Sequence, residues 1–264
     1  MKLSPKKRTL ISLVLISISL VGWIVLLFNP GHIMTVEHCS MSDSGPSEAS
    51  LQMLLDMNPL SSQLLGWGLM VVAMMFPKLI FPIQHIYTTS LKRNRFPLSL
   101  LFVFGYTAVW MAAGIVMIII ILAFHLFMPG SYIPAAVIGF IALVWQFSPV
   151  KQRCLNRGHQ HIVFAAFGWP ASRDSLLFGI NHGVWCAGSG WALMLFPMLL
   201  PTGHNLAMIV VTFIMLSEHF EHPRVPVWRF DLRPKLFLII LDRIGFLFKP
   251  VTVKFSKPLQ NRVS

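Results

Sequence analysis

Residues 60–83, LSSQLLGWGLMVVAMMFPKLIFPI, form the apolar stretch that decides the class of this chain. A helix that crosses the hydrocarbon core of a bilayer needs about 20 consecutive apolar residues. A run of that length does not fit the core of a small soluble domain. The stretch also carries Met70, Met74 and Met75, whose thioethers suit core packing or a soft metal ion such as Cu(I). We therefore expect a membrane-embedded protein, with the lipid bilayer as its first partner.

The composition of the whole chain points the same way. Of its 264 residues, 55% are apolar and 11% charged, and the mean hydropathy is +0.70. A soluble domain carries about 25% charged residues. The net charge of +12 is concentrated at the chain ends and in two loops, without a basic stripe interleaved with aromatic residues. Nucleic-acid binding is therefore not expected.

Hydrophobic segments along the chain predict an all-α, polytopic transmembrane helix bundle of about six spans. The first segment follows basic residues as a signal peptide would. Its apolar run is longer than a signal h-region, however, and no small-residue cleavage site precedes Asn29, so we interpret it as a retained span. The predicted spans are 10–28, 60–83, 98–127, 132–149, 175–200 and 204–222.

The distribution of Lys and Arg predicts the orientation. Cytoplasmic connections of membrane proteins are enriched in both residues, and here basic and non-basic connections alternate, which places both termini in the cytoplasm. We expect a multi-pass protein of the cell inner membrane. The non-basic connections are 29–59, 128–131 and 201–203, and the basic ones are 84–97, 150–173 and the C-terminal tail.

Three regions follow from this topology. Residues 1–59 hold the first span and an acidic outer loop, 60–222 form a five-span membrane domain, and 223–264 form a basic cytoplasmic tail. Within the tail, 236–248 is too short to span and carries charges at its middle, so we expect an interfacial helix on the inner leaflet.

Polar groups inside the spans are the first candidates for function, because burying them in hydrocarbon is costly. His182 and Cys186 are four residues apart, so both project from one helix face, about 6 Å from each other. An imidazole and a thiolate can ligate copper or zinc, although a hydrogen-bonded polar pair is an equal alternative. Glu218, in the inner part of the predicted sixth span, lies at a similar depth and could meet His182. We expect the neighbouring residues His219, Glu221 and His222 to lie at a solvated helix end.

Further soft or borderline ligands lie outside these two spans. Cys154, His159 and His161 follow the fourth span as a Cys-x4-His-x-His cluster that could accept a metal, or could occur by chance. Met74 and Met75 are auxiliary soft ligands or core filler. The outer loop offers a weaker copper-capture hypothesis, with His32, Met34, His38, Cys39 and Met41.

Other patterns limit the alternatives. We find no GxSxG, Walker, HExxH or dinucleotide motif, so a hydrolytic or nucleotide-dependent enzyme is not expected. The predicted fifth span is rich in glycine, which lets a partner helix approach its backbone and suggests a central position in the bundle. Its glycines are Gly179, Gly183, Gly188 and Gly190.

Five motifs follow one another over about residues 60–222. They are Met70-x-x-Ala73-Met74-Met75-x-Pro77, Gly105-Tyr106-x-x-Val109-Trp110, Gln146-x-x-Pro149-x-Lys151-x-x-Cys154-Leu155, Gly179-x-x-x-Gly183-x-x-Cys186-x-Gly188-x-x-Trp191-x-Leu193-Met194, and Glu218. In this order they resemble the pattern of a bacterial family of uncharacterised integral membrane proteins that are predicted to bind metal, some of which are labelled copper chaperones.

This chain departs from the family pattern at several thiols. The family's Cys-x-x-Cys-Cys run keeps only Cys186, with Ser189 and Gly190 at the other two positions. A second cysteine expected shortly after Cys154 is missing, and the family's Glu-Lys pair reads Glu218-His219. Either histidines replace the lost thiols, which shifts the preference toward zinc or Cu(II), or this member has lost metal binding.

The leading hypothesis is a metal-handling inner-membrane protein without enzymatic activity. The metal would be copper, with zinc as the alternative. The protein would deliver the metal to a membrane or exported metalloenzyme, or assist the maturation of that enzyme. In this hypothesis His182, Cys186 and Glu218 form the inner cluster. The competing hypotheses are a non-catalytic subunit of a membrane complex and a transporter of a metal ion or small solute.

Overall fold

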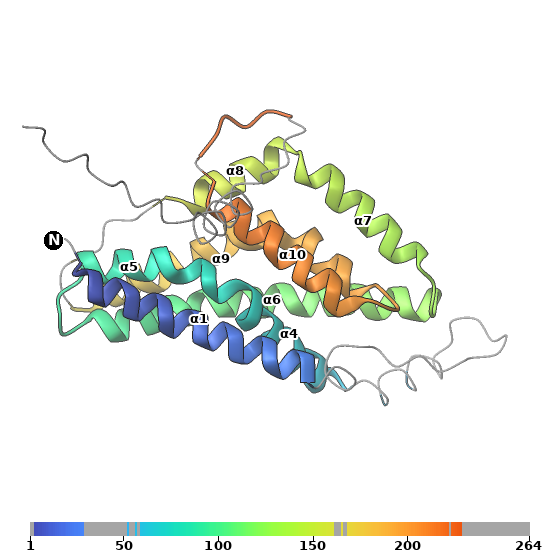
Figure 1. Cartoon of the computed structure of the whole chain (residues 1–264), viewed down its shortest axis with the longest axis horizontal. Coiled ribbons are helices and arrows are strands. Elements are labelled where there is room, and N and C mark those ends of the chain that lie inside the picture. The colour runs from blue at the N-terminus through green and yellow to red at the C-terminus, as the bar shows by residue number, and fades with distance from the viewer. Residues whose placement is uncertain are drawn as a thin grey trace, which may run out of the picture.

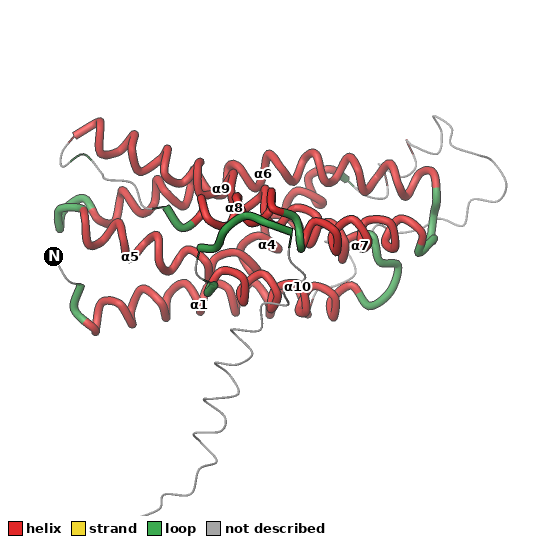
Figure 2. Tube along the Cα trace, turned by 90° about the horizontal axis from the view of Figure 1, so that it is seen from above, coloured by secondary structure: helices red, strands yellow, loops and turns green. Residues whose placement is uncertain are grey.

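The computed structural model describes residues 3–28, 52, 56, 59–160, 165, 168–221 and 223–228. Over these residues the regular structure is entirely helical, as the sequence predicts. The helices form an elongated bundle whose long helices run roughly along one axis (Figures 1 and 2). The predicted interfacial helix at 236–248 and the predicted outer loop at 29–59 fall outside the described residues, apart from Gln52, Asp56 and Pro59.

Two long helices form the centre of the bundle: α6 (Arg95–Phe127) and α9 (Gly168–Met198). They approach so closely that a Cβ on Gly179 would overlap the Phe102 carbonyl oxygen, and one on Gly183 would lie 3.0 Å from the Val109 Cβ. The prediction that glycines bring a partner helix to this segment is confirmed. Because α9 is central, several of its polar residues are buried, namely Ser175, His182 and Ser189.

One side of this central pair is covered by a broken helix, against which α1 (Pro5–Phe28) packs in turn (Figure 1). The broken helix consists of α4 (Leu60–Met75), the 3₁₀ turn η1 (Phe76–Leu79) and α5 (Ile80–Thr89). The break coincides with Pro77, which lacks the backbone N–H that a continuous helix would need. The predicted span 60–83 therefore continues to Thr89 but is interrupted by a tight turn.

The other side is covered by α7 (Ile133–Gln146), α8 (Pro149–Gly158) and α10 (His204–His219). Helix α8 begins at Pro149 after a Ser148 N-cap, whose Oγ accepts a hydrogen bond from the Val150 N–H at 3.1 Å. The chain bends by 68° between α7 and α8. This bend turns α8 back against α9, and it lies just before the end of the predicted fourth span at residue 149.

Within the described residues, three helical stretches are long and apolar enough to cross a membrane: Pro5–Phe28, Leu60–Thr89 and Arg95–Phe127. The bent pair α7–α8 would make a fourth if it counts as one span. The remaining predicted spans correspond to α9, which carries polar residues, and to α10, which has only 16 residues. A helical protein with three or four spanning stretches agrees with a membrane protein, whereas six spans and their orientation stay predictions.

Candidate metal centre

Four segments that are distant in the sequence meet at one small cavity. Its volume is about 20 Å³, which is room for roughly one water-sized group. The lining combines thiols, imidazoles and one ammonium group. The polar lining residues include Lys78 of η1, Cys154 and His159 of α8 and its C-cap, His182 and Cys186 of α9, and His219 at the end of α10.

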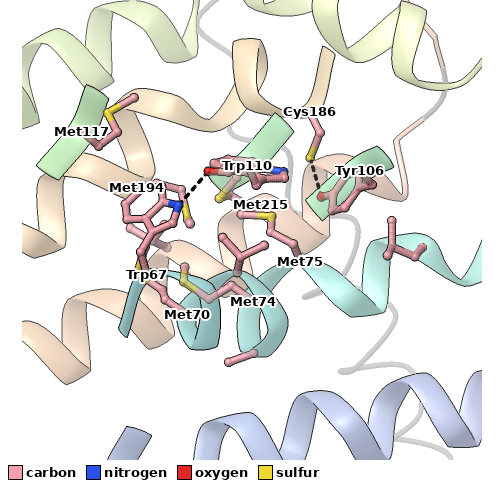
Figure 3. Close-up of a cluster of buried hydrophobic side chains, with 14 of the residues drawn as sticks. Trp67, Met70, Met74, Met75, Tyr106, Trp110, Met117, Cys186, Met194 and Met215 are labelled. Atoms are coloured by element: carbon pink, nitrogen blue, oxygen red, sulfur yellow. Dashed lines mark hydrogen bonds between the residues drawn. The ribbon is translucent and has the colours of Figure 1, made fainter. Parts of the chain in front are cut away.

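Helix α9 contributes the pair that the sequence singles out. His182 and Cys186 are both buried and both line the cavity, as their four-residue spacing predicts. The Cys186 Sγ lies 3.2 Å from the Tyr106 hydroxyl, a contact drawn in Figure 3, and 4.0 Å from the Lys78 Nζ. A thiolate can only accept hydrogen bonds, so once Cys186 is deprotonated both groups donate to it. They therefore fix where this sulfur points.

Helix α8 brings Cys154 and His159 to the same cavity. Cys154 can approach α9 because Gly188 has no side chain: a Cβ there would lie 3.2 Å from the Cys154 Sγ. The two nitrogens of His159 lie 2.7 Å from the Leu155 carbonyl oxygen and 3.1 Å from the His219 carbonyl oxygen. To bind a metal, His159 would have to release one of these two contacts.

His219 is placed differently from the solvated helix end that its position predicts. Its ring stacks on His159, with centroids 5.5 Å apart, and lines the same cavity as Lys78. Its Nε2 is buried and has no hydrogen-bond partner among the described residues. A neutral imidazole nitrogen that makes no hydrogen bond can ligate a metal ion. The solvated interpretation of His219 is therefore wrong.

The cavity thus offers two sulfur and three imidazole donors, a set suited to copper or zinc. Within the part of the chain that the structure describes, no three side chains of His, Cys, Asp or Glu already surround one point closely enough to hold a metal ion. The donors would therefore have to rotate inward on binding. Cys154 and Cys186 are both free thiols.

Glu218 lies close in sequence to His219 but does not line this cavity. Its Oε1 is 2.8 Å from the Nζ of Lys151 and accepts a short hydrogen bond from Gln146. Both members of the Lys151–Glu218 pair are buried. The carboxylate is thus compensated by an ammonium group, which gives it a structural partner in place of a metal, and its role as a direct ligand stays a prediction.

Met74 and Met75 are completely enclosed in the core. They belong to a group of buried methionines contributed by several helices and arranged beside Trp67 and Trp110 (Figure 3). Neither thioether lines the small cavity. Their predicted role as auxiliary soft ligands is therefore untested, and packing accounts for their burial. The other labelled members of the group are Met70, Met117, Met194 and Met215.

A second, larger cavity adjoins the first. Its volume is about 310 Å³, and it shares His182 and Trp185 with the smaller one. Arg157 lies over the Trp185 ring at 4.6 Å from its centroid, and Gln160 and Asn181 complete the polar part of the lining. His182 lines both cavities, so its imidazole is a candidate ligand that the larger space shares with the smaller one.

Other ligands predicted from the sequence lie outside the described residues: His161, His222 and the outer-loop set His32, Met34, His38, Cys39 and Met41. Conversely, the sequence analysis did not identify Lys78 as a site residue, and it placed His219 at a solvated helix end. Lys78 could have been found, since it is the only charged residue in the apolar stretch 60–83 and follows Pro77. A charge retained within such a run needs an internal partner.

These features describe a helical protein with three or four described stretches apolar enough to span a membrane, and with a buried cavity of thiol and imidazole donors. Residues 64–230, more than half of the chain, match the PpoB2 copper chaperone family. The chain therefore belongs to this family, and the sequence resemblance noted over residues 60–222 is confirmed in its copper chaperone part. The matched region includes every lining residue of the small cavity. No curated protein and no solved structure matches the chain.

Proposed function

We propose that this protein handles copper within the cell inner membrane and delivers it to a membrane or exported metalloenzyme. The observation that carries the proposal is the convergence of Cys154, His159, His182, Cys186 and His219 on one cavity of about 20 Å³. Membership of a copper chaperone family supports the choice of metal.

The donor set explains how the site would replace the thiols that the family pattern has and this chain lacks. Ser189 lines the same cavity but its hydroxyl donates to the Cys186 carbonyl oxygen at 2.9 Å. His219 instead presents a buried, unpartnered nitrogen. Two thiolates with imidazoles retain enough soft character for Cu(I), and the imidazoles also tolerate zinc. The substituted site thus remains suited to a metal ion.

Release to a partner also fits the geometry. The cavity is small and no three donors are preset around one point in the described part of the chain, so binding requires side-chain movement. A site that must reorganise binds less tightly than a rigid one, because part of the interaction energy offsets the cost of reordering. Such a site favours transfer over permanent storage.

The test is Cu(I) binding by the purified full-length protein in detergent, with a chromophoric Cu(I) chelator as competitor. We expect Cys186→Ser, Cys154→Ser and His182→Ala each to lower the Cu(I) affinity by at least about tenfold, since even indirect partners of metal ligands contribute that much. His125→Ala is the matched control, because this histidine lies on α6 near the Phe127 end, bonded to the Ile121 carbonyl oxygen.

The same measurement separates the competing hypotheses. If the wild-type protein and all three variants bind no metal, the copper proposal fails. Co-purification of a stoichiometric partner without metal would then favour a structural subunit of a membrane complex. Vesicle uptake of copper that depends on His182 would favour a transporter.

A further inference from the structure

A lysine is buried within the candidate metal centre, although a cation there opposes a metal. Lys78 is only 4% exposed, and its Nζ lies 4.0 Å from the Cys186 Sγ. It is carried by the 3₁₀ turn η1, which interrupts the first helix of the five-span domain. It lines the same cavity as His219, so one residue lies beside two candidate ligands.

No carboxylate compensates this ammonium group at the cavity. In the described ranges the ion pairs are Lys151–Glu218 and Arg224–Glu221, neither of which involves Lys78. The lining contains no Asp or Glu. A buried charge without compensation is costly, so the thiols are the groups that can balance it.

Charge counting then distinguishes between metal ions. Sulfur ligates metal as thiolate, so Cys154 and Cys186 supply two negative charges once their protons have passed to solvent. Lys78 supplies one positive charge, while His159, His182 and His219 bind metal as neutral imidazoles. A monovalent ion brings the sum to zero. A divalent ion leaves one uncompensated positive charge in a buried site.

We propose that Lys78 is a specificity-determining residue that makes this centre select a soft monovalent cation, Cu(I), over divalent zinc. This inference rests on the proposed function. The ammonium group repels a divalent ion about twice as strongly as a monovalent one at the same distance, because the Coulomb energy scales with charge. Its Nζ lies 4.0 Å from the Cys186 Sγ, so a metal ion on that sulfur would lie within reach of this charge.

This role accounts for a departure from the family's thiol pattern. A centre with three imidazoles would by ligand type accept zinc readily. The fixed positive charge of Lys78 opposes that shift without adding a thiol. Selectivity for copper is thus maintained by charge where the ligand set alone no longer ensures it.

The experiment compares the Cu(I) and Zn(II) affinities of the full-length protein, each measured with a chromophoric chelator. Lys78→Gln removes the charge and keeps a polar side chain of similar length, and Lys78→Leu removes both charge and polarity. Lys78→Arg keeps the charge. A methionine is avoided because its thioether is itself a copper ligand.

We expect Lys78→Gln to reduce the ratio of Cu(I) to Zn(II) affinity by at least about tenfold, mainly through tighter zinc binding. Lys78→Arg should keep the ratio within about threefold of the wild-type value. Lys78→Leu repeats the charge removal should the glutamine variant fail to fold.

An unchanged ratio in a charge-removing variant whose Cu(I) binding persists would overturn the role of Lys78 and leave the proposed function standing. If the wild-type protein binds neither ion, the proposed function itself is overturned, and this inference with it.

Discussion

At the scale of single residues, the Lys151–Glu218 pair shows how a buried charge is tolerated in this protein. Lys151 is fully enclosed, although its position after a predicted span suggests a cytoplasmic loop residue. Its Nζ contacts both the Glu218 carboxylate and the Gln146 amide oxygen. The pair links α8 to α10 and so holds Cys154 and His219, on the same two elements, near the cavity.

We expect Lys151→Met to lower the free energy of unfolding by about 3–5 kcal/mol, because it leaves the Glu218 carboxylate buried without its cation. The double variant Lys151→Met/Glu218→Gln removes both charges and should recover most of the loss. The measurement is thermal unfolding of the detergent-solubilised protein. A double variant as unstable as the single one would show that the packing of Lys151, and not its charge, is what matters.

Which site residues can be foreseen depends on whether they share one element. His182 and Cys186 lie on one helix at a spacing of four, so their meeting is predictable from periodicity. The arrival of His219 and Cys154 depends on the packing of α8 and α10 against the centre of the bundle. That arrangement follows from the 68° bend after α7, which Pro149 permits but no periodic pattern encodes. Glu218 shows that a similar depth does not ensure contact. The sequence predicts that it could meet His182, whereas the structure pairs its carboxylate with Lys151.

At the scale of elements, the contact between α6 and α9 fixes the positions of Tyr106 and Cys186. We expect Gly179→Ala to destabilise the protein by about 1–3 kcal/mol, since its Cβ would overlap the Phe102 carbonyl oxygen, which belongs to backbone and cannot rotate away. Separation of the two helices should also weaken Cu(I) binding. Thermal unfolding and chelator competition measure the two effects.

Gly68→Ala is the matched control for this substitution. Gly68 lies in α4, where a Cβ would meet only the Met111 side chain at 3.5 Å, an ordinary contact. Alanine is a better helix former than glycine by about 1 kcal/mol, so this variant should be as stable as the wild type or more so. Equal destabilisation of both variants would contradict the close approach of α6 and α9.

At the scale of the whole molecule, the charge pattern and the length of α6 together predict how the chain crosses the membrane. Helix α6 has 33 residues and rises about 50 Å at 1.5 Å per residue, more than the roughly 30 Å of hydrocarbon it would cross. Its two ends should therefore lie on opposite sides. Lys92 precedes one end in a basic connection, and Met128 follows the other in a connection without Lys or Arg.

A cysteine placed at either exposed position tests this orientation with a membrane-impermeant thiol reagent. In a Cys39→Ser background, which removes the cysteine of the predicted outer loop, Met128→Cys should react in intact cells, because its connection is predicted to face outward. Lys92→Cys should react only after lysis. Cys154 and Cys186 are buried and give the background signal. The opposite pattern would invert the predicted topology and place the basic connections, and α8 with them, outside the cell.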